Sequence, residues 1–374
     1  MDRKLDLRIA AAYLRDYGGH LGFRAIVRNP FNQRALVIQN TEAYEGEGWH
    51  DTMPQRPPYT AQELKLRVDM HIIILSTFLG TSRTPVSMCG AGLLLLFIAL
   101  WAARTDIAQA FGFDKIVGLS NLCFAIPLAV FGAEHLSGAR SIMLGVPSYM
   151  PWRLFWAYFV GFALLAASLS IATKLQVRWS GLLFGIMMFT FVAMIHIPRA
   201  LANPSNRIAW VIVLREMSFA GAGWILAGTA MREQGKSILI TVGRVVIAIA
   251  AIVFGAEHFL HPAGCPGVPL EKLMPAWIPG RLLIGYLTGA ILLVAGTCIL
   301  LAKKIRMAAT YLGTWIVLLV LFIYAPILIV QISDPSPASQ VEGINYFADT
   351  LLFAGAILVL ASNSKKHDSF EVAK

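Results

Sequence analysis

Charged residues are scarce in this chain: Asp, Glu, Lys and Arg make up 14% of its 374 residues, against 57% hydrophobic residues. A mean hydropathy of +0.65 is far above that of a soluble globular domain. Apolar runs of about 18 residues or more recur along the sequence, and each is long enough to cross roughly 30 Å of hydrocarbon. The composition therefore predicts an all-α, multi-pass integral membrane protein whose first partner is the lipid bilayer.

Cysteine is also rare. The chain has four cysteines, without CxxC or metal-ligand spacing, and three of them lie within apolar runs: Cys89, Cys123 and Cys298. The soluble catalytic motifs GxxxxGK[ST], GxSxG and HExxH are missing, as is the CxxCH haem site. We therefore expect no metal site, no covalently bound cofactor and no disulfide chemistry. The first 60 residues mix charges throughout, so no signal peptide is expected.

The formal net charge is +10, but the basic residues mostly lie in short loops between apolar runs. Orientation in a membrane explains this pattern, so nucleic acid is not an expected partner. One set of loops, together with the C-terminal tail, carries about twice as many basic residues as the other set, among them Lys174, Lys303, Lys304 and Lys365. The positive-inside rule then predicts an inner-membrane protein with a cytoplasmic C-terminus.

Charges and helix breakers divide the chain into spans. Two sets of four spans are predicted, at about 116–133, 154–173, 182–197 and 209–230, then at 238–256, 282–302, 308–330 and 346–360. An earlier apolar stretch, 70–103, is broken at 81–85, so it either crosses the membrane at 86–103, forms a hairpin or lies in the interface. The predicted segments are a mixed-charge region 1–69, the ambiguous stretch 70–114, two four-helix units 115–232 and 233–364, and a polar tail 365–374.

The two sets of spans share sequence. The pentapeptide Phe131-Gly-Ala-Glu-His135 recurs 123 residues later as Phe254-Gly-Ala-Glu-His258. Further ordered matches are Gly145-Val-Pro147 with Gly267-Val-Pro269, Tyr158-x-x-Gly161 with Tyr286-x-x-Gly289, Pro198 with Pro326, and Phe219-Ala-Gly-Ala222 with Phe353-Ala-Gly-Ala356. A duplicated unit with an even number of spans crosses in the same sense both times, so a rough two-fold axis along the membrane normal is expected.

Ionisable residues gather toward the outer half of the predicted spans, where each costs roughly 2.5 to 3.5 kcal/mol at a helix centre. The pentapeptides end the first and fifth spans. Tyr324 occupies the position in the second unit that corresponds to His196 in the first. The candidate polar pocket comprises Glu134, His135, His196, Arg215, Glu216, Glu257, His258, Tyr324 and Asp349.

Three interpretations of these residues are open. They are mutually paired and fix helix packing, or they form a pocket that exchanges protons with a ligand such as a quinone head group, or they bind a metal. The metal alternative needs His135, His196 and Met194, and it is weakened because tyrosine replaces His196 in the second unit. Since the halves agree on the pentapeptide and disagree elsewhere, a structural role for the pentapeptide is favoured, with any chemistry in the first half.

The order of elements resembles the DoxX-like superfamily of four-helix membrane proteins over residues 115–364. The elements are Gly132-Ala-Glu-His135, Pro147 to Pro151, Gly161 to Lys174 and Glu216, followed by Gly255-Ala-Glu-His258, Pro269 to Pro279, Gly289 to Lys304 and Asp349. That superfamily includes a subunit associated with thiosulfate:quinone oxidoreductase and a membrane partner in methylamine utilisation. The resemblance implies a redox-adjacent membrane role and no particular reaction. Together with the repeated Glu-His pair and Arg215-Glu216, it leads to the hypothesis of a quinone-linked or accessory subunit of a redox system, with a redox-complex subunit as partner. This chain departs from it by joining two units and by lacking paired cysteines.

Two functions of other classes remain as alternatives. A small-metabolite transporter or permease would suit a duplicated architecture with charges at membrane depth. A non-catalytic assembly or scaffold protein would use the N-terminal segment to hold a partner.

Overall fold

The computed structural model describes residues 9–15, 21–28, 35–39, 83–231 and 238–364. The chain forms two compact units, Met1–Leu66 and Arg67–Lys374, which are described separately. The first contains an antiparallel sheet that the sequence patterns did not predict, with strands in the order β1 (Ile9–Arg15), β2 (Leu21–Arg28) and β3 (Ala35–Gln39). The first part of the ambiguous stretch, 70–82, lies outside the described residues.

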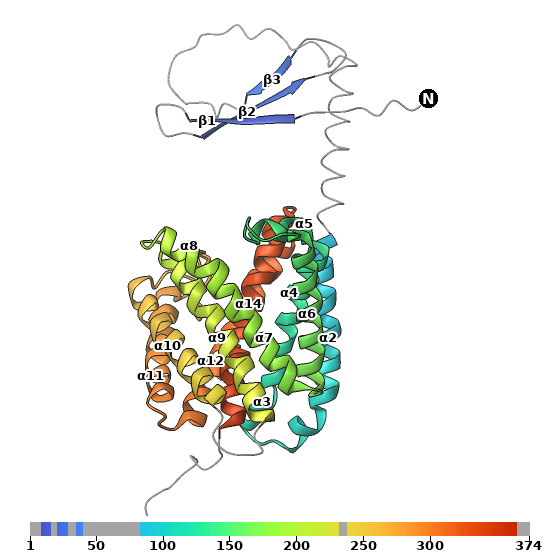
Figure 1. Ribbon diagram of the computed structural model, residues 1–374. Coiled ribbons are helices and arrows are strands. Elements are labelled where there is room, and N and C mark those ends of the chain that lie inside the picture. The colour runs from blue at the N-terminus through green and yellow to red at the C-terminus, as the bar shows by residue number, and fades with distance from the viewer. Residues whose placement is uncertain (1–8, 16–20, 29–34, 40–82, 232–237, 365–374) are drawn as a thin grey trace, which may run out of the picture. The chain divides into compact units, whose positions relative to one another are not determined.

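The second unit is helical (Figure 1). Its elements are α2 (Arg83–Gln109), α3 (Asp114–Gly118), α4 (Ser120–Ser137), α5 (Ala139–Ile142), η1 (Met143–Gly145), α6 (Arg153–Thr173), α7 (Val177–Phe191), η2 (Val192–His196), α8 (Ile197–Ala202), α9 (Arg207–Ala230), α10 (Ile238–Leu260), α11 (Arg281–Leu300), α12 (Ile305–Leu319), η3 (Val320–Tyr324), α13 (Ala325–Ile332) and α14 (Pro337–Asn363). Eight helices of the described chain are long and apolar enough to cross a membrane. Helix α4, which is bent by 89° from α5 and η1, makes a ninth if that bent pair counts as one span.

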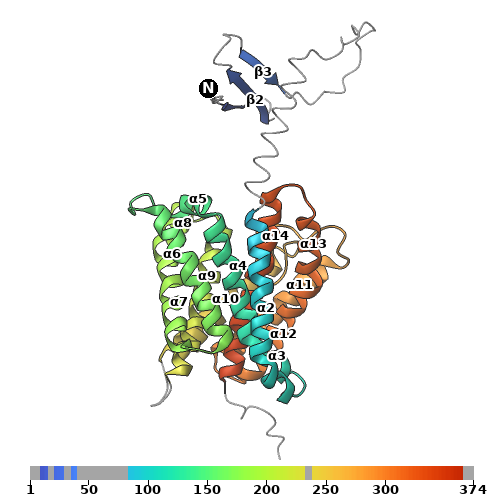
Figure 2. The same ribbon diagram turned by 90° about the vertical axis from the view of Figure 1, so that its right-hand side faces the viewer.

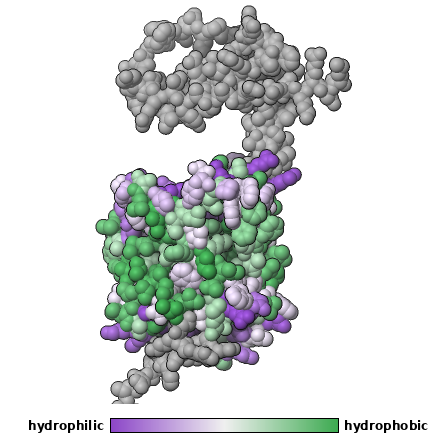
Figure 3. All heavy atoms as spheres, in the orientation of Figure 1, coloured by the Kyte–Doolittle hydropathy of each residue, from purple (hydrophilic) through white to green (hydrophobic). Residues whose placement is uncertain are grey.

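On the face shown in Figure 3, the surface of these helices is mostly apolar around the middle and more polar at both ends. Large side chains such as Phe97, Phe162 and Leu283 are more than 60% exposed. A soluble protein rarely exposes apolar area on this scale, whereas lipid tails cover it without cost. The chain is therefore a multi-pass membrane protein in contact with the bilayer, as predicted.

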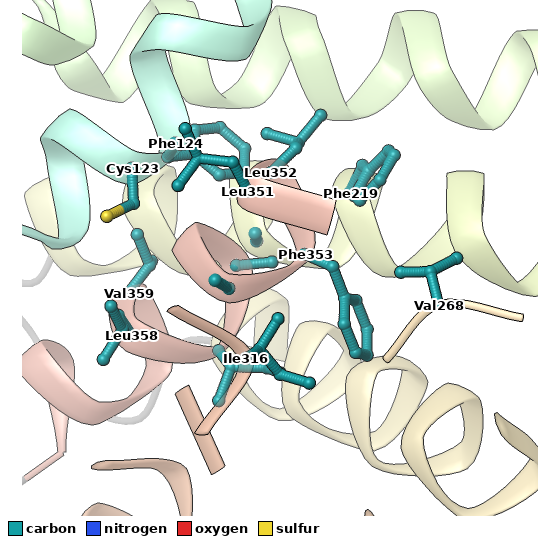
Figure 4. Packing of buried hydrophobic residues seen from close by; sticks show 14 of the residues in the cluster. Cys123, Phe124, Phe219, Val268, Ile316, Leu351, Leu352, Phe353, Leu358 and Val359 are labelled. Carbon is teal, nitrogen blue, oxygen red and sulfur yellow. The ribbon is translucent and has the colours of Figure 1, made fainter. Parts of the chain in front are cut away.

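Helix α14 forms the centre of the bundle. Every residue from Ala348 to Ala361 is buried, on all sides of the helix, because α14 packs against α4, α9 and α12. Figure 4 shows this core around Phe353, with Phe219 and Ile316 close by. The ring of Phe353 lies 5.4 Å from that of Phe254 on α10.

The two predicted sets of four helices are α4, α6, α7 with α8, and α9, followed by α10, α11, α12 with α13, and α14. The first helix of each set packs against the fourth helix of the other, so α4 contacts α14 and α10 contacts α9. The fourth helices also contact each other. This is the contact pattern that a two-fold axis between α9 and α14 would produce.

Both third helices contain a five-residue π-helical turn, η2 and η3. Each turn ends two residues before a proline, Pro198 or Pro326. Proline has no N–H to donate and its ring displaces a carbonyl of the preceding turn, which accounts for the irregular turn at this place. The π turns end at His196 and Tyr324, the two positions that the sequence matches place in correspondence.

Helix α2 settles part of the ambiguous N-terminal stretch. Residues 83–109 form one 27-residue helix, so no hairpin occurs among them. Thr84 lies close to Gly138 at the end of α4, whereas Asp106 forms an ion pair with Lys174 at the end of α6. Helix α2 therefore begins at the same end of the bundle as the pentapeptides, packs beside α4 and reaches the opposite end of the bundle (Figure 2).

Candidate functional site

The histidine of each pentapeptide bonds back to its own helix. Nδ1 of His135 lies 2.8 Å from the carbonyl oxygen of Phe131, and Nδ1 of His258 lies 2.6 Å from that of Phe254. A carbonyl can only accept, so Nδ1 carries the proton in both rings. In the neutral imidazole, Nε2 is then left as a hydrogen-bond acceptor.

The glycine of each pentapeptide lets the first and second helices of its set approach closely. A Cβ atom on Gly132 would lie 3.0 Å from the carbonyl oxygen of Gly161, and one on Gly255 would lie 3.0 Å from that of Gly289. Such contacts between small residues are typical of helix packing in membranes. These glycines thus have the same structural role in both sets. Their partners, Gly161 and Gly289, are the glycines of the two matching Tyr-x-x-Gly segments.

The glutamate of each pentapeptide reaches the fourth helix of the other set, but the partners differ. Glu134 accepts a hydrogen bond of 3.1 Å from Nδ2 of Asn345 on α14. Glu257 forms an ion pair of 2.9 Å with Arg207 on α9, and Nε2 of His261 lies 4.0 Å from the same oxygen. One glutamate therefore has a cationic partner and the other a neutral amide.

Arg215 joins the two fourth helices. Its Nη1 lies 2.7 Å from Oδ2 of Asp349, and its Nη2 lies 2.8 Å from Oε1 of Glu216. The three side chains are only 11% to 16% exposed. A guanidinium group has enough donors for two carboxylates, and buried charges need such partners. The structure thus brings three of the predicted residues into one network that links the sets.

In the second set, His258 and Tyr324 hold a loop inside the bundle. The backbone N–H of Gly267 donates to Nε2 of His258 over 2.9 Å, and the hydroxyl of Tyr324 donates to the carbonyl oxygen of Pro266 over 2.8 Å. Gly267 has a φ of +102°, a conformation that favours glycine. Residues 265–270 are all buried. The polar tips of both side chains are therefore occupied by the loop backbone.

Cys265 lies in this inserted loop and is 2% exposed. Burial raises the pKa of the Cys265 thiol to about 12, although the charge of Lys272 works in the opposite direction. The group is consequently a neutral thiol at physiological pH, and it acts as a small apolar side chain.

The first set lacks the corresponding insertion. The matching loop residues Gly145, Val146 and Pro147 are only partly buried, and Arg153 holds them by donating to the carbonyl oxygens of Val146 and Leu144 at 2.9 and 3.0 Å. Within the part of the chain that the structure describes, neither Nε2 of His135 nor the ring of His196 has a hydrogen-bond partner. Side chains at corresponding positions of the two sets thus differ in their hydrogen-bond partners.

A small hollow opens near the second pentapeptide. It is lined by Arg207, Glu257, His258, His261, Gly264, Cys265, Pro269 and Leu270. The described residues include no group of three His, Cys, Asp or Glu side chains that could hold a metal ion. The hollow brings together two predicted residues, Glu257 and His258, with two that were not predicted, Arg207 and His261.

Asn345 was also not predicted. It is one helical turn before Asp349 on α14, so both side chains lie on the same face of the helix. That spacing is a signal that sequence reasoning could have used, but a neutral amide does not stand out in an apolar run as a charge does.

Comparisons with models of protein families, with curated proteins and with solved structures found no match for this chain.

Proposed function

We propose that this chain is a DoxX-like accessory subunit of a quinone-linked redox system, located in the cell inner membrane with its C-terminus in the cytoplasm. Most of the polar groups at membrane depth are satisfied within the chain and hold its helices together. Such pairing suits a subunit that binds and positions a membrane-soluble molecule for a partner. The excess of basic residues at the ends opposite the pentapeptides supports the orientation.

Quinone binding is supported by a difference in hydrogen bonding between side chains at corresponding positions of the two sets. His258 and Tyr324 are occupied by the inserted loop, whereas His135 and His196 have no such partner in the described chain. A polar ring nitrogen at membrane depth costs free energy unless it is hydrogen-bonded. A head group that both donates and accepts hydrogen bonds could supply a partner for either histidine.

The chemistry of a quinone fits these groups. The carbonyl oxygens of a quinone accept hydrogen bonds, and the hydroxyl groups of the reduced form donate them. His135 offers Nε2 as an acceptor because its Nδ1 is already engaged. His196 can act either way, and imidazole exchanges protons near neutral pH. Both oxidation states could thus be held, with electrons passed to or from a partner protein.

Binding of decylubiquinone to the full chain in lipid nanodiscs tests the proposal, with quenching of tryptophan fluorescence as the measurement. His196→Phe should weaken binding about tenfold, because loss of one hydrogen bond at a desolvated site costs about 1.4 kcal/mol. Tyr324→Phe is the matched control at the equivalent position and should leave affinity unchanged. Equal affinity of His196→Phe and wild type, or no saturable binding at all, would overturn it.

A transporter for a small metabolite is the second candidate, and the Arg215–Asp349 ion pair favours it. The pair lies between the two sets of helices, which is where transporters built from parallel repeats bind their substrates. Uptake of a panel of labelled metabolites into proteoliposomes, abolished by Glu216→Gln, would support this candidate over the first.

A further inference from the structure

The two pentapeptide glutamates present a natural comparison, since they occupy equivalent positions in the same motif. Glu257 has Arg207 as a partner, at 2.9 Å. Glu134 has Asn345, and no cation forms an ion pair with it in the described chain. A carboxylate removed from water normally requires a cation or several N–H donors. The state of Glu134 therefore needs a separate explanation.

The amide of Asn345 supplies a second observation. Its Nδ2 donates to Oε1 of Glu134 over 3.1 Å, whereas its Oδ1 is fully buried and has no partner among the described residues. An ionised carboxylate can only accept, so it cannot satisfy that oxygen. A neutral carboxylic acid can, because its O–H would donate to Oδ1 while its carbonyl oxygen accepts from Nδ2. A carboxylic acid and a primary amide form two hydrogen bonds in this way.

The charges around Glu134 do not favour its ionised form. The titratable side chains at this end of α4 and of the elements packed on it are His135, Arg83, Arg140, Arg153, Tyr158, Glu342, Tyr346 and Asp349, and none forms an ion pair with Glu134. Arg153 donates to loop carbonyls. Asp349 lies one turn below Asn345, and Arg215, the cation there, is already shared by Asp349 and Glu216. A third negative charge would be repelled without compensation.

We infer that Glu134 is a proton-binding site, in which the side chain takes up a proton from the water at the outer end of α4 and is held as a neutral acid by the amide of Asn345. The step is a simple protonation: a carboxylate oxygen gains a proton as an O–H group, and no electrons are transferred. Glu134 thereby places an exchangeable proton beside Asn345, which lies one helical turn from Asp349 on α14. The inference rests on these hydrogen bonds and does not depend on quinone binding.

Infrared difference spectroscopy on the purified full chain tests it, through the carbonyl stretch of protonated carboxylic acids at neutral pH and its shift in D2O. Wild type should show an acid band that is lost in Glu134→Gln. Gln can still pair with Asn345 through two hydrogen bonds, so this variant should fold.

Glu257→Gln is the matched control in the other pentapeptide and should keep the band. Asn345→Leu is a further variant, which removes the amide and should move the band's frequency. The inference is overturned if Glu134→Gln retains the full wild-type acid band, or if Glu257→Gln is the variant that loses it.

Discussion

Arg215 and Asp349 occupy equivalent positions in the two sets of helices and form an ion pair with each other. The match of Phe219 with Phe353 sets an offset of 134 residues, and the same offset pairs Arg215 with Asp349. Residues at a two-fold axis meet their own equivalents. If both halves had the same charged residue at positions 215 and 349, the two side chains would repel each other. The ion pair therefore depends on a sequence difference between the halves.

Removal of Arg215 should destabilise the bundle strongly. Arg215→Met leaves Glu216 and Asp349 buried without their cation, and breaking a buried pair in this way costs about 3 to 5 kcal/mol. Thermal unfolding in detergent would measure the loss. The exchange Arg215→Asp with Asp349→Arg restores opposite charges across the axis and should recover part of the stability. No recovery would indicate that the surroundings of each position, rather than the charge pair, determine stability.

The pentapeptide glycines should not tolerate a side chain. A Cβ on Gly255 would lie 2.9 Å from the backbone nitrogen of Leu293, so Gly255→Ala should lower the free energy of unfolding by about 1 to 3 kcal/mol. A Cβ on Gly90 of α2 would have no neighbouring atom within 4 Å, and Gly90→Ala is therefore the control. Alanine favours helix over glycine by about 0.5 to 1 kcal/mol, so that variant should unfold at the same or a slightly higher temperature.

His258 should keep the inserted loop resistant to protease. His258→Phe leaves the N–H of Gly267 without an acceptor, at a cost of about 1 to 3 kcal/mol. Trypsin should then cleave faster after Lys272, which lies in the same loop. His135→Phe at the equivalent position of the first set should not change cleavage at Lys272. Unchanged cleavage in His258→Phe would mean that packing alone holds the loop.

Cys265 should react slowly with maleimide and make stability depend on pH. Burial raises its pKa from 9.0 to about 12, so below pH 9 the thiol is neutral in both the folded and the unfolded chain. As pH rises from 9 toward 12, the unfolded chain loses its proton first, and the stabilisation of the folded state decreases.

A variant that keeps Cys265 as its sole cysteine should label rapidly at pH 8 only after denaturation. Cys265→Ala should show a weaker loss of stability between pH 9 and pH 11 than wild type. Rapid labelling of the folded protein would contradict the buried position of this thiol.

Hydropathy was sufficient to predict the helical membrane fold, because an apolar run as long as 238–256 is rare outside a membrane-spanning helix. The matches between the halves also predicted that His196 and Tyr324 are equivalent, and both prove to end a π turn. The partner of each polar group could not be predicted in the same way. Glu134 and Glu257 have identical local sequences but bond to Asn345 and Arg207, since each partner comes from the fourth helix of the other set, far away in the sequence.

The burial of the inserted loop could not be predicted from the sequence either. Gly145-Val-Pro147 and Gly267-Val-Pro269 have the same letters, yet only the second segment is buried in the bundle. The difference arises from long-range contacts to His258 and Tyr324, which no local pattern encodes. The strands β1 to β3 were missed because their short runs carry no alternation clear enough to separate them from a mixed-charge segment.

The position of α2 determines at which face of the bundle the described helical region begins. Helix α2 begins beside Gly138, and α14 ends at the opposite face of the bundle, past the buried Ala361. The chain therefore enters and leaves its membrane region through different faces. A molecule that binds at the start of α2 and one that binds at the end of α14 would therefore approach the protein from opposite faces of the bundle.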